Sequence, residues 1–357
     1  MPETPATARL NSLDQFRGYT VAGMFVVNFL GGLAVTPAIL KHHNTYCSYA
    51  DTIMPQFFFA AGFALRLVML KKLDGGATQS PVMFRGLRRA LGLLIFGLIF
   101  YHLDGDFGKW QQLLENGWSG FFRDSFRRNA FQALVHIAVT TLWILPVIAR
   151  SWKTRVIFTA FSAGLHVWLS HEFWYETLNR WHVIDGGVLG FLTWTVPMIA
   201  GSLAYDVVRS PQPALRRLVI GGTIAMLAGY GLSCLTAGGH LAPPPFFPPS
   251  MPVDLWTMSQ RAGSLSYLLW SAGWSLALYA VFCRLCDGRG WSLAVFRDLG
   301  RNALAAYVLH FMVMGAVLKF CPGDSPAWWA ILMCALHFGI IWWWGRWLNA
   351  RGLFLRL

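Results

Sequence analysis

Residues 40–67, LKHHNTYCSYADTIMPQFFFAAGFALRL, place two adjacent histidines and an aspartate directly before a long apolar run. The run has about 20 mainly apolar residues, which is the length that an α-helix needs to cross the hydrocarbon core of a bilayer. The stretch therefore predicts a membrane-spanning helix that begins near residue 50, with His42, His43 and Asp51 clustered at its mouth.

The composition extends this prediction to the whole chain. Of its 357 residues, 55% are hydrophobic and only 13% are charged, which is unlike a soluble domain of this length. Apolar segments of this length are too long for barrel strands, and in lipid only helices and closed barrels satisfy their backbone groups internally. We expect one all-α domain, a polytopic bundle of about ten transmembrane helices near residues 18–40, 50–70, 83–102, 129–149, 155–171, 187–208, 215–236, 260–283, 300–320 and 327–348.

The charges are distributed as a membrane topology requires. Most of the 29 basic residues fall in the tails and in the even-numbered connections, and more than half of the 16 acidic residues fall in the others. By the positive-inside rule both termini are cytoplasmic, with 1–17 as an N-terminal segment, 18–348 as the membrane bundle and 349–357 as a tail. The net charge of +13 is thus explained by the membrane topology. We expect the lipid bilayer as a partner, and no nucleic acid.

Three connections on the opposite, outer side are longer than a turn requires: 103–128, 171–186 and 237–258. The first alternates aromatic and polar residues, as an interfacial helix or a re-entrant segment would, and the third is rich in proline. Long loops beside a bundle often cover a site. We therefore expect the functional site at the outer face, where His42 and His43 lie.

The first candidate site joins Asn28 to these histidines. Asn28 lies about ten residues into the first predicted span, near mid-membrane at a rise of about 1.5 Å per residue, where a carboxamide needs a polar partner or a wet cavity. Asp51 could hold one ring nitrogen of His42 or His43 and leave the other free as a base or nucleophile. Alternatively, the histidines are interfacial residues and Asp51 is only a helix cap.

The second candidate site lies in residues 300–310, GRNALAAYVLH, which place Asn302 and His310 in an apolar helix. An ionisable residue inside a span is a functional hypothesis by default, and a neutral histidine hydrogen-bonded between helices is the alternative. His136, Gln260 and Arg261 raise the same choice.

The cysteines predict no metal site. Cys283 and Cys286 form a CxxC pair without a second pair or a histidine at ligand spacing. Cys47 and Cys321 both fall on the predicted outer side, and whether they form a disulfide is left open.

Several stretches in order resemble the heparan-alpha-glucosaminide N-acetyltransferase family of transmembrane acyltransferases and its bacterial relatives. They are RLNSLDQFRG (9–18), MFVVN (24–28), a histidine at 42 or 43, ADTIMPQFFFAAG (50–62), DGGVLGFL (185–192), SQRAGSLSYLLWSAG (259–273) and GRNALAAYVLH (300–310). The resemblance is most specific in the first 62 residues and around 300–310.

The resemblance implies an enzyme of the plasma (inner) membrane of a bacterium. It would move an acyl group, acetyl in the family, from cytoplasmic acyl-CoA to an amine or hydroxyl of a saccharide or envelope-related acceptor on the far side. The family's essential histidine corresponds to His42, which follows Lys41 as in the family's K-H, with His43 second. Asn28 and Asp51 complete the implied catalytic set.

The other site residues divide between donor and acceptor. For acyl-CoA we expect contacts from Asp14, Arg17, Arg88, Arg89, Asn302 and His310, the arginines through the CoA phosphates. The positive-inside rule explains the same arginines without a ligand. For the acceptor we expect Gln260, Arg261, His136 and Asp185.

Two departures from the family pattern leave the acceptor open. Glycine (186 or 187) replaces the glutamate of the family's D-P-E-G turn, and His136 stands where members often carry an arginine. A transporter or flippase of a sugar or lipid, or a relative that binds acyl-CoA without turnover, remains the alternative. The oligomeric state, a homodimer included, is also left open.

Overall fold

Helices form all the regular structure in the described part of the computed structural model, which comprises residues 10–43, 45–102, 109–127, 131–181, 183–237, 241–248 and 252–355. No strand occurs in these residues, which confirms the all-α prediction. The α-helices are α1 (Asn11–Leu30), α2 (Ile53–Asp74), α3 (Gln79–His102), α4 (Trp110–Arg127), α5 (Ala133–Ile148), α6 (Trp152–Leu169), α7 (Tyr175–Trp181), α8 (Phe191–Arg209), α9 (Ala214–Ser233), α10 (Leu265–Phe282), α11 (Ala294–Arg301), α12 (Ala303–Val317) and α13 (Ala327–Ala350).

Six of the described helical segments are long and apolar enough to cross a membrane. They are Ala50–Asp74, Gly187–Arg209, Ala214–Thr236, Leu265–Asp287, Ala303–Phe320 and Ala327–Ala350, and α5 is a shorter apolar helix. The chain thus has the helices of an integral membrane protein. Each of the ten predicted segments contains a helix, but α1, α3 and α6 are not among the six. The number ten stays a prediction.

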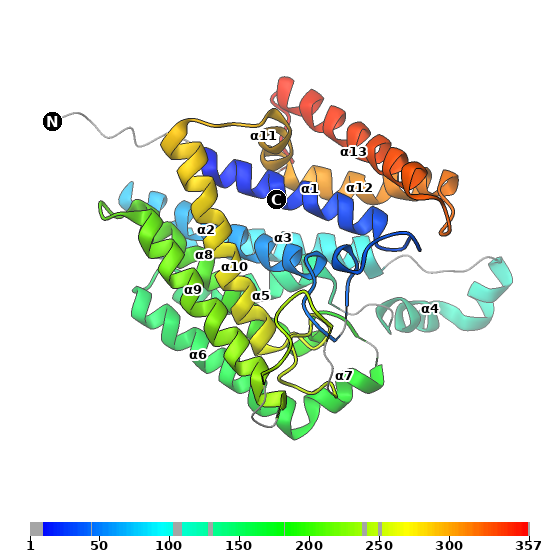
Figure 1. Cartoon of the computed structure of the whole chain (residues 1–357), viewed down its shortest axis with the longest axis horizontal. Helices are drawn as coiled ribbons and strands as arrows, with labels where there is room; N and C mark the ends of the chain where they lie inside the picture. Colours follow the sequence, from blue (N-terminus) through cyan, green and yellow to red (C-terminus); the bar gives the residue numbers. More distant parts are fainter. Residues whose placement is uncertain are drawn as a thin grey trace.

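The connections differ in length at the two ends of the bundle. Short turns join α2 to α3, α5 to α6 and α8 to α9 at one end, on the left of Figure 1. The connections after α1, α3, α6 and α9 gather at the other end. The three long connections predicted for one side therefore lie together, although the α10–α12 connection, which includes α11, is also long and the α12–α13 connection is short.

The boundaries of the first span were predicted wrongly. The structure begins α1 at Asn11, inside the predicted 1–17 segment, and ends it at Leu30 rather than near residue 40. Residues 31–49 form an irregular connection with one 3₁₀ turn, Ala38–Leu40. Apolar composition continues past Leu30, but Gly31, Gly32 and Pro37 favour loop structure over helix.

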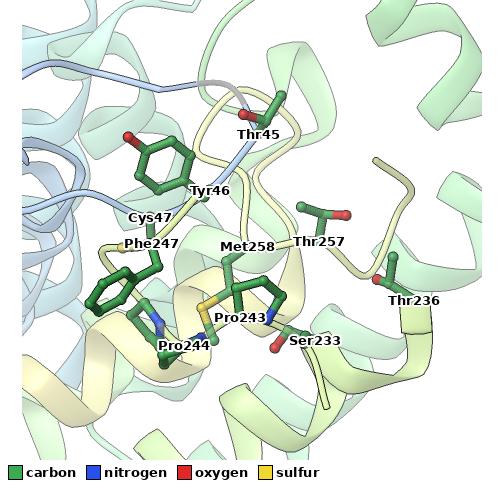
Figure 2. Close-up of a pocket in the computed structure, with 12 residues that line it drawn as sticks. Thr45, Tyr46, Cys47, Ser233, Thr236, Pro243, Pro244, Phe247, Thr257 and Met258 are labelled. Atoms are coloured by element: carbon green, nitrogen blue, oxygen red, sulfur yellow. The ribbon is translucent and has the colours of Figure 1, made fainter. Parts of the chain in front are cut away.

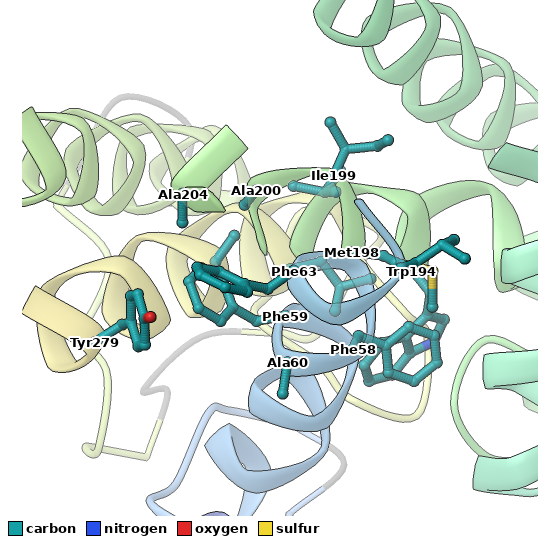
Figure 3. Close-up of a cluster of buried hydrophobic side chains, with 14 of the residues drawn as sticks. Phe58, Phe59, Ala60, Phe63, Trp194, Met198, Ile199, Ala200, Ala204 and Tyr279 are labelled. Atoms are coloured by element: carbon teal, nitrogen blue, oxygen red, sulfur yellow. The ribbon is translucent and has the colours of Figure 1, made fainter. Parts of the chain in front are cut away.

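Close helix contacts at small residues hold the bundle together. A Cβ at Gly62 of α2 would lie 1.7 Å from the Met198 carbonyl oxygen of α8, and a Cβ at Gly201 would lie 1.9 Å from that of Phe59. The backbones of α2 and α8 therefore touch, as small residues permit in membrane helices. Around this contact, Phe58 and Phe63 pack with aromatic side chains of α8 and α10 in one buried cluster (Figure 3).

The predicted interfacial segment is helical. The side chains of Trp110, Leu114, Trp118 and Phe122 of α4 are all exposed, and a kink at Gly117 divides the helix between Leu114 and Trp118. Its contact with a lipid interface stays a prediction. All six cysteines are free, so the structure does not pair Cys47 with Cys321.

Candidate functional site

A cavity of about 610 Å³ opens at the end of the bundle where the long connections gather. Its walls come from α1, α2, α5 and α12 and from the connections after α1, α7 and α9. Its volume falls in the range of about 300–1,000 Å³ that is typical of small-molecule sites. The cavity brings together most of the predicted catalytic and acceptor residues: Asn28, His42, His43, Asp51, Asp185, Gln260 and Arg261.

His42 and Asp51 form a hydrogen-bonded pair on the cavity wall. Nδ1 of His42 lies 2.9 Å from Oδ1 of Asp51, whose side chain is fully buried, whereas the His42 side chain is 48% exposed. The contact places the proton of a neutral ring on Nδ1, since a carboxylate only accepts hydrogen bonds. Nε2 is thereby left as the basic nitrogen of the ring.

Asp51 is held from several sides, so it is not a simple helix cap. Its Oδ2 accepts hydrogen bonds from the backbone N–H and the hydroxyl of Ser48, both at 2.9 Å. Tyr267 of α10 donates to the Asp51 carbonyl oxygen at 2.6 Å. The sequence analysis missed Ser48 and Tyr267. The S-x-x-D spacing of Ser48 and Asp51 was a readable signal for the first, but no local signal marks the second.

His43 makes different contacts. Its Nε2 donates to the Ala38 carbonyl oxygen at 2.7 Å, and its ring stacks on Tyr46 with the centroids 4.2 Å apart. Its backbone N–H lies 3.4 Å from Oδ2 of Asp51. The two histidines thus differ, because His42 has the carboxylate partner and His43 contacts the loop backbone and Tyr46.

The surroundings favour a protonated His42. Burial lowers the pKa of His42, but the hydrogen bond and the charge of Asp51 raise it by more, with smaller contributions from Asp185 and Gln260. The pKa therefore lies above its usual value of 6.5. A histidine of this kind is a stronger base than a free imidazole and can exchange protons near neutral pH.

Asn28 lies near the C-terminal end of α1, two residues before its last residue. Its Nδ2 lies 3.0 Å from Nε2 of His310, whose Nδ1 lies 3.0 Å from the Tyr307 carbonyl oxygen. In a neutral ring, Nδ1 donates to the carbonyl and Nε2 accepts from the Asn28 amide. The amide keeps a second N–H, and both Asn28 and Tyr307 line the cavity.

Asp185 enters the cavity from a strained loop. It has a positive φ of 57°, which costs a residue with a side chain about 1 kcal/mol, and Gly186 and Gly187 follow with φ of 80° and 58°. Two contacts hold this backbone: Gly186 N–H donates to the Arg261 carbonyl oxygen at 2.8 Å, and the indole N–H of Trp194 donates to the Asp185 carbonyl oxygen at 2.8 Å. Glycine at positions 186 and 187 adopts positive φ at little steric cost and so permits this turn.

Gln260 pairs with Asp185. Its Nε2 donates to Oδ1 of Asp185 at 2.8 Å, and its buried Oε1 has no hydrogen-bond partner among the described residues. Burial raises the pKa of Asp185 to about 6, although the hydrogen bond from Gln260 and the charge of His42 lower it. Arg261 instead donates to the Leu178 carbonyl oxygen at 3.1 Å and fastens the loop to α7.

The remaining predicted residues do not line the cavity. His136 is fully buried one turn below it on α5, between Phe131 and Trp194. Asn302 donates to Oδ1 of Asn349 of α13 at 2.9 Å. Four predicted donor-binding residues lie near the opposite end of the bundle. Asp14 is buried and Arg17 partly buried in the N-terminal half of α1, and Arg88 and Arg89 are exposed on α3.

Part of the N-terminal motif has a packing role. Gln15 donates to Ser292 at 2.8 Å and to the Leu293 carbonyl oxygen at 3.1 Å. A Cβ at Gly18 would lie 1.7 Å from the Phe296 carbonyl oxygen, and one at Gly300 would lie 1.9 Å from that of Asp14. The stretches that carry the family resemblance therefore bring α1 and α11 into backbone contact.

A second, smaller pocket lies between residues 45–47 and the proline-rich connection (Figure 2). Its volume of about 30 Å³ holds a water molecule but no substrate. No three His, Cys, Asp or Glu side chains of the described residues converge as a metal-ligand set.

No protein-family model matches the chain, and no curated protein matches it. The residues of the cavity are therefore the basis for its chemistry. The cavity offers His42 as a base with Asp51 as its orienting carboxylate. It also offers the amide of Asn28 as a donor, and Asp185 as a second carboxylate that pairs with the amide of Gln260.

Proposed function

We propose that this protein is a membrane-embedded acyltransferase that passes an acyl group from cytoplasmic acyl-CoA to an amine or hydroxyl of a saccharide or envelope-related acceptor at the outer side. The observation that carries the proposal is the pairing of His42 with the buried Asp51 at 2.9 Å on the wall of the cavity that Asn28 also lines. A base oriented by a carboxylate, with an amide donor nearby, is the arrangement that acyl transfer requires.

The proposal includes a topology of ten spans, with both termini cytoplasmic, in the inner membrane of a bacterium. The helices α1, α3, α5 and α6 would cross the membrane together with the six long apolar segments. The clustering of the long connections at one end of the bundle supports this topology (Figure 1). Labelling of single cysteines placed at residues 76 and 116 tests it, because the first should react only from the cytoplasmic side and the second only from outside.

His42 would act as the general base. Its Nε2 takes the proton of the acceptor while the acceptor nitrogen or oxygen bonds to the thioester carbon, and the carbon–sulfur bond then breaks. The proton passes from His42 to the leaving thiolate, so the products are the acylated acceptor and CoA thiol. In the alternative two-step route, Nε2 itself carries the acyl group as an acyl-imidazole before the acceptor attacks.

Asn28 would stabilise the negative charge that develops on the thioester oxygen. One N–H of its amide contacts His310, and the other remains available to the cavity. His310 would then position the amide rather than contact CoA. We keep Asp14, Arg17, Arg88, Arg89 and Asn302 as proposed donor-side residues near the cytoplasmic end, where the arginines could meet CoA phosphates.

Asp185 and Gln260 would hold the acceptor. Together they offer a carboxylate oxygen and the unpartnered Oε1 of Gln260, which are two hydrogen-bond acceptors on the same wall. An acceptor molecule with hydroxyl or amine donors satisfies both, and burial makes their satisfaction worth more than in water. Arg261 would hold the connection that carries Asp185 against α7, and His136 of α5 would pack beneath that connection without contacting the acceptor.

The test is release of CoA thiol by the purified protein with acyl-CoA and a panel of amine and sugar acceptors, followed by identification of the acylated product. The proposal predicts acceptor-dependent thiol release. A transporter or flippase would instead move a solute across vesicles without breaking the thioester, and a binding protein would retain acyl-CoA without turnover. Either outcome would overturn the proposal.

A further inference from the structure

Much of the cavity lining is apolar. Its lining includes Met24 and Val27 of α1, Met54 and Phe57 of α2, and Phe311 and Met314 of α12, which we call the apolar wall. Asp185 and Gln260 contribute to the rest of the lining, from the two connections beside it. The cavity therefore presents two kinds of surface to one bound molecule or to two.

None of the six side chains of the apolar wall is fully exposed. Met24 is 4% exposed and Val27 only 1%, and the other four are partly buried. Phe311 packs edge-on against His310, the ring that also contacts Asn28. The wall is therefore continuous with the residues proposed to hold the thioester.

An acetyl group would leave this wall mostly uncovered. Three of its six residues are methionines, which have flexible, polarisable side chains that adapt to unbranched chains. Asn28 contacts His310, and Met314 lies one helical turn, about 6 Å, further along α12. This length suits an alkyl chain of several carbons that runs from the Asn28 amide toward Met314.

We infer that the apolar wall holds the alkyl part of the transferred acyl group, so that the preferred donor is an acyl-CoA with a chain longer than acetyl. The inference rests on the proposed acyltransferase function and names its donor class. The reaction is unchanged: the carbon–sulfur bond of the thioester breaks, the acyl carbon bonds to the acceptor, and the acceptor proton ends on the CoA thiol.

The first test compares acetyl-, butyryl-, hexanoyl- and octanoyl-CoA with the wild-type protein and one acceptor. Each added methylene that the wall covers should raise kcat/KM about threefold to fourfold, the equivalent of about 0.8 kcal/mol. A steady fall in kcat/KM from acetyl to octanoyl would overturn the inference and leave the proposed function standing. Absence of thiol release from every donor would overturn both.

The second test narrows the wall. Met314→Phe should lower the ratio of octanoyl to butyryl turnover at least about tenfold, because overpacking removes space at the far end of the chain. Met312→Phe is the matched control, since Met312 lies two residues away on α12 and is 68% exposed. The ratio of octanoyl to butyryl turnover in Met312→Phe should equal that of the wild type.

The ratio is measured within one preparation, so a lower folded fraction of either variant does not change it. If Met314→Phe proves too unstable to purify, Met54→Phe narrows the wall from α2 and should lower the same ratio. Equal ratios in the wild type and in a wall variant would show that the alkyl chain lies elsewhere, and would overturn the inference.

Discussion

Nδ1 of His42 lies 2.9 Å from Oδ1 of Asp51, and this contact distinguishes His42 from the adjacent His43. The carboxylate has no exposure to solvent and is held by Ser48, so it fixes the imidazole from the protein side. His43 contacts the Ala38 carbonyl oxygen and Tyr46 instead. The proposed chemistry depends on this asymmetry.

The pH dependence of turnover should report the His42–Asp51 pair. Only the neutral ring accepts a proton, so kcat/KM should rise with pH, with a midpoint above 6.5 because the pKa of His42 is raised. In Asp51→Asn the charge that raises this pKa is lost, so the midpoint should move to lower pH and the maximal rate should fall. A pH–rate profile from about 5 to 9 measures both effects.

Glu176→Gln is the control for that profile. Glu176 is an exposed carboxylate on α7 whose ion-pair partner is the equally exposed Arg180. Its removal should leave the midpoint unchanged. An unmoved midpoint in Asp51→Asn would contradict the pairing of Asp51 with the catalytic base.

Substitutions of Asn28 should separate an oxyanion role from a structural one. Asn28→Leu should lower kcat by about 10²–10³-fold, the usual effect of losing one donor to an oxyanion. Asn28→Asp keeps the size of the side chain and accepts a hydrogen bond from a His310 ring that is protonated on both nitrogens, but it cannot donate to an oxyanion. We expect it to retain thermal stability in detergent and to lose kcat as severely as Asn28→Leu. Wild-type kcat in Asn28→Asp would show that the amide only holds His310.

The sequence predicted the residue types at this site better than the helix ends and the partners. The order of Asn28, His42 and Asp51 was sufficient to place them together, and the span beginning near Asp51 was located well. The end of the first helix was misjudged because apolar composition continues through residues 31–40, where glycine and proline end the helix. Periodicity and composition do not register a helix end inside an apolar run.

Contacts between distant segments were beyond sequence reasoning. Nothing local shows that Gln260 pairs with Asp185, or that Tyr267 reaches the backbone of Asp51. The same holds for Gly18 and Gly300, whose motifs suggested donor binding and which serve the packing of α1 on α11. Such pairs depend on how the helices cross, which a single sequence does not determine.

A buried cluster at the opposite end of the bundle should contribute to stability. Asp206 of α8 accepts hydrogen bonds from Arg66 of α2, at 3.0 Å and 3.3 Å, and from the fully buried Arg155 of α6. Asp206→Asn leaves two buried arginines without a counter-charge. We expect a loss of about 3 kcal/mol, the low end for a buried pair, because the Asp206 side chain is 29% exposed.

The matched control is Asp74→Asn, which breaks the ion pair with Arg209, where both side chains are about half exposed. An exposed pair contributes at most about 1 kcal/mol, so this variant should unfold close to the wild type. Thermal unfolding of both variants in the same detergent measures the difference. Equal losses would show that the cluster has no special role.

The most direct test of the central claim compares thiol release from acyl-CoA by His42→Ala and His43→Ala, purified in equal folded amounts. We expect His42→Ala to lose activity by about 10²-fold or more, as is usual for a general base, and His43→Ala to keep most of it. Equal activity in the two variants, or a larger loss in His43→Ala, would contradict the assignment of His42 as the catalytic base.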